Sequence, residues 1–122
     1  MIDPIIFLLL LLQIKHWYFD FINQTPEEIA SKGIYGDSLG INHSAKHAIG
    51  TMLCVVLVTG IEYITLAGVI AFFDFVLHYH IDWIKMRFGN TDIKTKSYWI
   101  HLGADQMAHQ LTYLFIIWMV FA

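Results

Sequence analysis

The sequence predicts an all-α protein: an integral membrane bundle of four helices in up-down-up-down order, with a short interfacial helix between spans 1 and 2. Two observations carry this fold class. Of the 122 residues, 57% are hydrophobic and only 14% are charged, whereas a soluble domain has roughly 45–50% apolar and about 25% charged residues. In addition, four segments are long and apolar enough for the spans of ~20 residues that a bilayer requires. The length allows a single domain, residues 1–122.

The spans follow one another with short connections. We expect them at residues 4–23, 43–59, 62–88 and 97–121. Pro4 suits the first turn of a helix, and no basic residue precedes it, so we expect this span to be retained rather than cleaved as a signal peptide. Residues 25–28 (Thr-Pro-Glu-Glu) are typical of a capping box that opens a short helix, which Gly33 would end. We expect loops at 33–42 and 89–96 and a tight turn at Gly60.

The basic residues predict the orientation. All seven fall on one side of the expected membrane: Lys15, Lys32, Lys46, Lys85, Arg87, Lys94 and Lys96. The positive-inside rule makes that side cytoplasmic and puts both termini on the non-cytoplasmic side. We expect Lys15 to extend its side chain to the interface. The few basic residues form no patch, which argues against nucleic acid as a partner.

Histidine and aspartate residues gather near the cytoplasmic ends of all four spans. Five pairs have the i,i+4 spacing that puts two residues on one helix face: His16–Asp20, His43–His47, His78–Asp82, His101–Asp105 and Asp105–His109. The helical rise of ~1.5 Å per residue predicts that four of these residues, one on each span, lie at similar depth: His16, His47, His78 and Asp105. Ionisable groups inside a bilayer normally face the bundle interior and mark function.

This residue chemistry favours a metal site. Imidazole and carboxylate together suit Zn, Mn or Fe, and there are more ligands than the three or four that one zinc needs, so we expect two divalent ions. Asp74 lies one turn deeper than His78 on the same helix face. Its role stays open between an extra ligand, a partner of a ligand, a proton relay and a hydrogen bond between helices. We expect His43, His80 and His101 to be structural.

The chain resembles an uncharacterised bacterial and phage family of small multi-span membrane proteins, a domain of unknown function. The HxxxDFxxQ, HxxIDxxK and DQxxH motifs carry the resemblance, at residues 16–24, 78–85 and 105–109. More distantly, it is similar to membrane-bound metal-dependent hydrolases. The resemblance implies the bacterial inner membrane and a metal-ligand set of His16, Asp20, His47, His78, Asp82, Asp105 and His109. Lys32 and Lys85 accompany that set, whereas Asp74, His43, His80 and His101 lie outside the family pattern.

We hypothesise a metal-dependent hydrolase that works at the cytoplasmic leaflet. Two ions would activate water and polarise a phosphoryl or acyl oxygen, and an aspartate that is not a ligand, or Asp74, would serve as general base. Lys32 and Lys85 would hold the head of an amphiphilic or anionic substrate by charge.

Two other functions remain open. A di-iron or copper membrane oxidoreductase would use the HxxxH pair of His43 and His47 and the His-Tyr-His run at residues 78–80. A non-enzymatic accessory or interaction subunit, in a larger membrane complex or a homo-oligomer, would hold one ion with no open coordination position.

Overall fold

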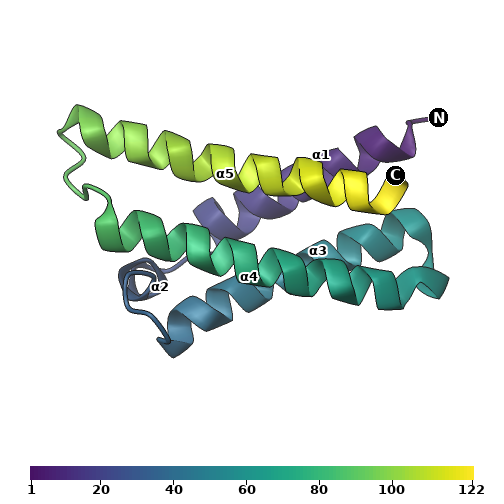
Figure 1. Cartoon of the computed structure of the whole chain (residues 1–122), viewed down its shortest axis with the longest axis horizontal. Helices are drawn as coiled ribbons and strands as arrows, with labels where there is room; N and C mark the ends of the chain where they lie inside the picture. Colours follow the sequence, from purple (N-terminus) through teal and green to yellow (C-terminus); the bar gives the residue numbers. More distant parts are fainter.

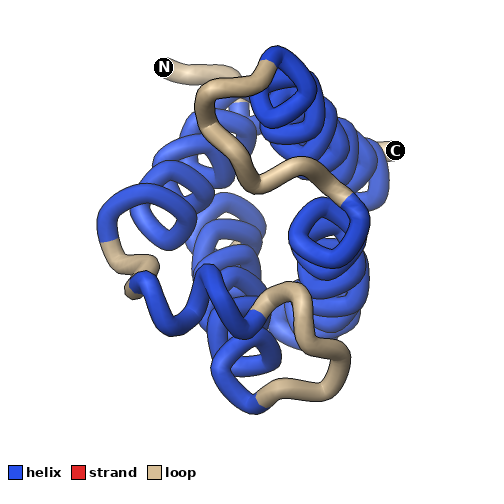
Figure 2. The backbone as a smooth tube through the Cα atoms, turned by 90° about the vertical axis from the view of Figure 1, so that its left-hand side faces the viewer, coloured by secondary structure: helices blue, strands red, loops and turns tan.

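The computed structural model describes all 122 residues and is entirely helical. Four long helices run alternately up and down the molecule, and a short helix lies across one end (Figure 1). The long helices are α1 (Pro4–Trp17), α3 (Ser38–Thr59), α4 (Ile64–Phe88) and α5 (Lys96–Phe121), and the short one is α2 (Pro26–Ser31). Long helices that follow one another in the chain pack together, and α1 also packs against α5, which closes the ring seen end-on in Figure 2. The predicted all-α class is confirmed.

Two helical stretches are long and apolar enough to cross a membrane. They are Pro4–Ile22, which joins α1 to a turn of π-helix, η1 (Tyr18–Ile22), and Ile61–Phe88, which joins the 3₁₀ turn η2 (Ile61–Tyr63) to α4. Helices α3 and α5 exceed the ~20 residues that a span needs, but their polar residues make them less apolar than these two stretches. Crossing by all four helices therefore stays a prediction.

The connection between α1 and α3 is shorter than expected, because α3 begins earlier in the sequence. As predicted, Thr25 caps α2, and its Oγ1 accepts a hydrogen bond from the Glu28 backbone N–H at 3.1 Å. However, α3 begins at Ser38 rather than at residue 43, so the expectation of loop through residue 42 was wrong. Asp37 caps the earlier start, because its carboxylate accepts a hydrogen bond from the Leu39 N–H at 2.9 Å. This extension places His43 well inside the helix.

The turn between α3 and α4 forms at Gly60, as expected. Its φ of 102° lies in a region that glycine adopts without strain. At the opposite end, residues 89–95 connect α4 to α5, and the N-cap of α5 is Thr95. Both chain termini lie at the Gly60 end, and α2 lies at the other end (Figure 1). All the basic loop residues are therefore remote from the termini.

The interior of the bundle has an apolar half and a polar half. The apolar core holds seven buried side chains: Leu8, Leu12, Val55, Ala67, Ile70, Tyr113 and Ile116. Buried polar and charged residues nevertheless outnumber buried hydrophobic ones, 15 to 10. Soluble proteins bury few charged groups, and those are paired. The polar half of this interior is consequently the region where a function is to be sought.

Candidate metal centre

Three overlapping groups of buried histidine and aspartate side chains lie between the four long helices. Within each group, one ligand atom per residue lies within 4.8 Å of every other. The groups are Asp20 with His43, His47 and His78; His16 with His78 and His109; and Asp20 with His78, Asp82 and His109. His78 belongs to all three groups. The arrangement brings imidazoles from all four long helices into one volume that can hold a metal ion.

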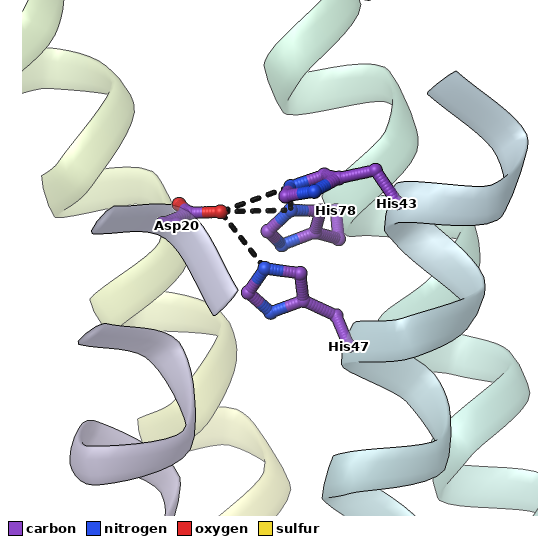
Figure 3. Close-up of side chains that lie close together, drawn as sticks. All are labelled: Asp20, His43, His47 and His78. Atoms are coloured by element: carbon purple, nitrogen blue, oxygen red, sulfur yellow. Dashed lines mark hydrogen bonds and ion pairs between the residues drawn. The ribbon is translucent and has the colours of Figure 1, made fainter. Parts of the chain in front are cut away.

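One half of this centre is built around a single carboxylate oxygen of Asp20. Asp20 Oδ1 lies 3.0 Å from His43 Nε2, 2.8 Å from His47 Nε2 and 3.7 Å from His78 Nε2 (Figure 3). The Nε2 atoms of His43 and His78 are 3.3 Å apart. In a tetrahedral shell with metal–nitrogen distances of ~2.0–2.1 Å, neighbouring ligand atoms are ~3.3–3.4 Å apart. The observed spacings bracket that value.

The other half faces His16 and His109. Asp20 Oδ2 lies 3.3 Å from His16 Nε2, and Asp82 Oδ1 lies 3.1 Å from His109 Nε2. The second oxygen of Asp82 points back to the first half, 3.1 Å from His78 Nε2 and 3.5 Å from His43 Nε2. Each of the two carboxylates thus has one oxygen in each half. Both carboxylates therefore link the two halves of the centre.

Local helix geometry positions these side chains. His43 and His47 are one turn apart on α3, and His78 and Asp82 are one turn apart on α4, so each pair projects from one helix face. Asp20 lies in the π turn η1, where the Asn23 N–H bonds to the Tyr18 carbonyl at 2.8 Å. The π turn forms the last turn of the first long helical stretch. This turn was not foreseen, and it sets the direction of Asp20.

The outward nitrogen of three imidazoles has its own partner. His43 Nδ1 lies 3.1 Å from Glu28 Oε2, His16 Nδ1 lies 2.8 Å from the Tyr113 hydroxyl, and His47 Nδ1 lies 3.3 Å from Lys15 Nζ. Glu28 and Tyr113 are partners of the kind that orient metal-binding histidines. The Lys15 ammonium only donates, so it makes His47 Nδ1 the acceptor and leaves the proton on Nε2, which donates to Asp20 Oδ1. Burial raises the pKa of the Glu28 carboxyl, but hydrogen bonds from Lys46 and His43 outweigh it and hold that pKa below its usual value. Glu28 is therefore an ionised acceptor for the His43 Nδ1–H.

Lys15 points into the bundle, so the expectation that it reaches the interface was wrong. Its side chain is buried, and Nζ donates to Asp74 Oδ2 at 3.3 Å and to the Tyr113 hydroxyl at 3.1 Å. Thr51 Oγ1 also donates to Asp74 Oδ2, at 2.5 Å. A carboxylate in a low-dielectric interior needs such a counter-charge. The deep position of Asp74, one turn further into the helix than His78, was the sequence signal for a buried polar partner.

The centre has buried polar atoms without hydrogen-bond partners. His78 Nδ1 and Asp82 Oδ2 have none of acceptable geometry, although Lys32 Nζ forms an ion pair with Asp82 Oδ2 at 2.9 Å. Lys32 balances the charge of Asp82, but the second buried carboxylate, Asp20, forms ion-pair contacts only with imidazoles and with no lysine or arginine. A divalent cation could supply that counter-charge, and the nitrogen and oxygen ligands suit Zn, Mn or Fe.

The ligand set implied by the family resemblance can now be compared with these groups. Six of its seven members lie in them: His16, Asp20, His47, His78, Asp82 and His109. Asp105 stands at the edge, with Oδ1 3.6 Å from His109 Nε2. The structure adds His43, which we expected to be structural, and the signal for it was its HxxxH spacing with His47. His80 and His101 lie elsewhere, bonded to the Tyr35 hydroxyl and the Asn90 N–H respectively.

The three residues proposed to act on the substrate occupy different places. Lys32 is buried against Asp82, and Lys85 lies 3.7 Å from Asp105 Oδ2. Both lysines line a cavity of about 480 Å³ that also touches Asp20 and Asp82. Asp74 is not part of that cavity wall and is held by Lys15 and Thr51 instead. Asp74 therefore lies on the Gly60 side of the centre and does not face the cavity.

Close contact between α1 and α3 depends on Gly50. A Cβ atom at this position would lie 2.7 Å from Lys15 Cγ and 3.0 Å from Phe19 Cε2. We expect Gly50→Ala to lower the unfolding free energy by about 1–3 kcal/mol, because overpacking displaces the buried lysine stem. Gly103→Ala is the matched control, since its Cβ would meet nothing within 4 Å. The stabilities of the two variants are compared by thermal unfolding in detergent. Equal stabilities would contradict the close packing at Gly50.

No protein-family model, curated protein sequence or solved structure matches this chain.

Proposed function

We propose that the protein is a membrane-embedded, metal-dependent hydrolase with a carboxylate-bridged pair of divalent ions. One observation carries the metal centre: the Nε2 atoms of five buried histidines converge on two aspartates, and each aspartate has an oxygen in both halves. Two ions held ~3.5–4 Å apart are common in hydrolytic sites. His43 and His47 would hold one ion and His16 and His109 the other, with His78 between them.

The surface of the bundle supports insertion of all four helices. Large apolar side chains point outward even on the two more polar helices: Ile49, Leu53 and Leu57 on α3, and Leu111, Leu114, Phe115 and Trp118 on α5. Soluble monomers rarely expose contiguous apolar surface on this scale, whereas lipid would cover it. The positive-inside rule then makes the α2 end cytoplasmic, and the family resemblance implies a bacterial inner membrane.

The chain's own groups would prepare the centre for chemistry. Glu28 accepts from the Nδ1–H of His43, so that the Nε2 lone pair of His43 would face inward. His16 Nε2 lies 2.8 Å from Gln106 Oε1, and an ion bound there would replace that hydrogen bond while Tyr113 holds the Nδ1 side. When His47 Nε2 is a ligand, its proton is on Nδ1, and we expect Lys15 then to keep only Asp74 and Tyr113 as acceptors. The bound pair would supply Lewis acidity, polarising a phosphoryl or acyl oxygen and making water a better nucleophile.

The cavity favours hydrolysis as the reaction class. It connects the centre to the α2 end of the bundle and is lined by Asp20, Asp82, Lys32 and Lys85, so water and a polar substrate group would meet the ions there. An oxidative reaction is the second candidate. It is favoured because histidines and bridging carboxylates inside a four-helix bundle are also the setting of di-iron and di-manganese proteins. The metal that the protein retains separates the two.

The first experiment is the metal content of protein purified in detergent without chelators or a histidine tag. We expect about two equivalents of a divalent metal per chain. His43→Ala should lower this to about one, because it removes a ligand from one half only. His101→Ala is the matched control and should keep both equivalents, since His101 contacts the Asn90 N–H rather than the centre.

The identity of the metal directs the activity assay. Zinc or manganese, together with metal-dependent release of a headgroup or acyl chain from lipid substrates, would support hydrolysis. Iron or copper would move the oxidative reaction to first place. Protein that retains no metal after reloading would refute the metal centre and favour an accessory or interaction subunit.

A further inference from the structure

The cavity beside the centre continues into a second, more apolar hollow. This groove of about 320 Å³ lies between the end of α4 and the start of α5, and five apolar residues line it: Ile81, Ile84, Phe88, Ala104 and Ala108. Three residues line both spaces: Lys85, His101 and Asp105. The rim residues Ile84 and Phe88 are exposed on the outside of the bundle. A polar chamber at the centre thus adjoins an apolar groove that opens sideways.

We propose that these two spaces bind a lipid with a phosphate-bearing headgroup. The headgroup occupies the cavity between the lysines and the metal centre, and the hydrocarbon chain leaves through the groove between α4 and α5. This inference rests on the proposed metal centre and names the substrate class for it. The cavity of about 480 Å³ is of the usual size for a small-molecule site, and a side opening lets a lipid enter from the bilayer.

Two lysines provide the recognition of phosphate. Lys32 Nζ is held at 2.9 Å from Asp82, which positions it at the metal side of the cavity. Lys85 Nζ is 3.7 Å from Asp105 Oδ2, longer than the ~2.7–2.9 Å of a charge-assisted hydrogen bond. This loose pairing leaves the ammonium of Lys85 able to turn to a ligand. It stands at the junction of cavity and groove, where the headgroup of a lipid would meet its chain.

The charge of the cavity makes phosphate binding depend on metal. Its wall carries three carboxylates (Asp20, Asp82 and Asp105) and two ammonium groups (Lys32 and Lys85), a net charge of −1 with His101 neutral. In the metal-free protein this charge disfavours an anion. A single divalent ion reverses the sign, and a second ion strengthens the attraction. A neutral lipid would gain no charge–charge attraction from either ion.

The test is the binding of dodecylphosphonate, measured by native mass spectrometry in nonionic detergent. The carbon–phosphorus bond of this ligand prevents ester hydrolysis. Metal content is measured first, and unbound metal is removed. We expect metal-loaded protein to bind dodecylphosphonate at least about tenfold more tightly than metal-free protein does, since one charge-assisted contact has that effect. Dodecanol, which lacks the phosphonate, and methylphosphonate, which lacks the chain, should both bind at least about tenfold more weakly.

Two substitutions separate the headgroup from the chain. Lys85→Gln should weaken dodecylphosphonate binding about tenfold by removing a charge-assisted contact. Ala104→Phe should weaken it to a similar degree by filling the groove, and should leave methylphosphonate binding unchanged. Met107→Phe is the matched control, because Met107 is exposed on α5 and lines neither space. Full metal content in each variant shows that the bundle is intact.

Distinct results would overturn the inference. Equal binding of dodecylphosphonate and dodecanol to metal-loaded protein would rule out phosphate recognition. Undiminished binding by Ala104→Phe would show that the chain does not use the groove. Equal binding of methylphosphonate and dodecylphosphonate would identify a site for free phosphate instead of a lipid. A protein that takes up no metal fails at the first measurement, which refutes the proposed metal centre itself.

Discussion

Replacing His78 with alanine should abolish stable metal binding by the whole centre. His78 is the one residue common to all three ligand groups, and its Nε2 lies near both aspartates, 3.7 Å from Asp20 Oδ1 and 3.1 Å from Asp82 Oδ2. Loss of a partner that merely orients a ligand typically costs 10–100-fold in metal affinity. We expect at least ~100-fold here, and a metal content below the one equivalent predicted for His43→Ala.

His80→Ala is the control for this experiment. His80 is two residues from His78 on the same helix, but it bonds to the Tyr35 hydroxyl and the Val76 carbonyl, away from the centre. The two variants differ only in which face of α4 loses an imidazole. For both variants, elemental analysis measures the metal content and circular dichroism measures the helicity. Full metal content in folded His78→Ala protein would place the ions elsewhere.

Replacing Lys15 with methionine should destabilise the bundle far more than replacing a partly exposed lysine does. The substitution leaves the Asp74 carboxylate buried without its counter-charge, and breaking one side of a buried ion pair costs about 3–5 kcal/mol. Thr51 remains as a hydrogen-bond donor to Asp74 but supplies no charge. The free energy of unfolding in mixed detergent measures the loss.

A double variant distinguishes an unpaired charge from lost packing. Lys15→Met with Asp74→Leu removes both charges, so most of the lost stability should return. Lys46→Met serves as the matched single change, because Lys46 also pairs with a carboxylate, Glu28 at 2.8 Å, but is partly exposed. Exposed pairs contribute about 0–1 kcal/mol. If Lys15→Met and Lys46→Met were equally mild, the inward direction of Lys15 would be refuted.

The sequence predicted the parts of the site that depend on helix spacing alone. The i,i+4 pairs and the common depth of His16, His47 and His78 follow from the helical rise, which is the same in any bundle. The structure places the rings of these three histidines together, with centroids 5.6 Å apart for His16 and His47 and 3.7 Å for His47 and His78. Local pattern therefore sufficed to find most of the candidate ligands.

The sequence could not predict how each helix is rotated about its own axis. That rotation is set by packing, and it brings His43 into the centre and leaves Asp105 at its edge. The earlier start of α3 at Ser38 depends on the Asp37 cap. Neither effect has a hydropathy signal.

By itself, the sequence determined that this is a helical protein with apolar spans and a layer of histidine and aspartate at one end of them, because hydropathy and helical periodicity are local properties. Only the tertiary structure decided that Lys15 turns inward to Asp74 and that Asp20, carried on a π turn, has one oxygen in each half of the centre. The physical reason is that a buried charge takes its direction from its partner, and that partner lies on another helix.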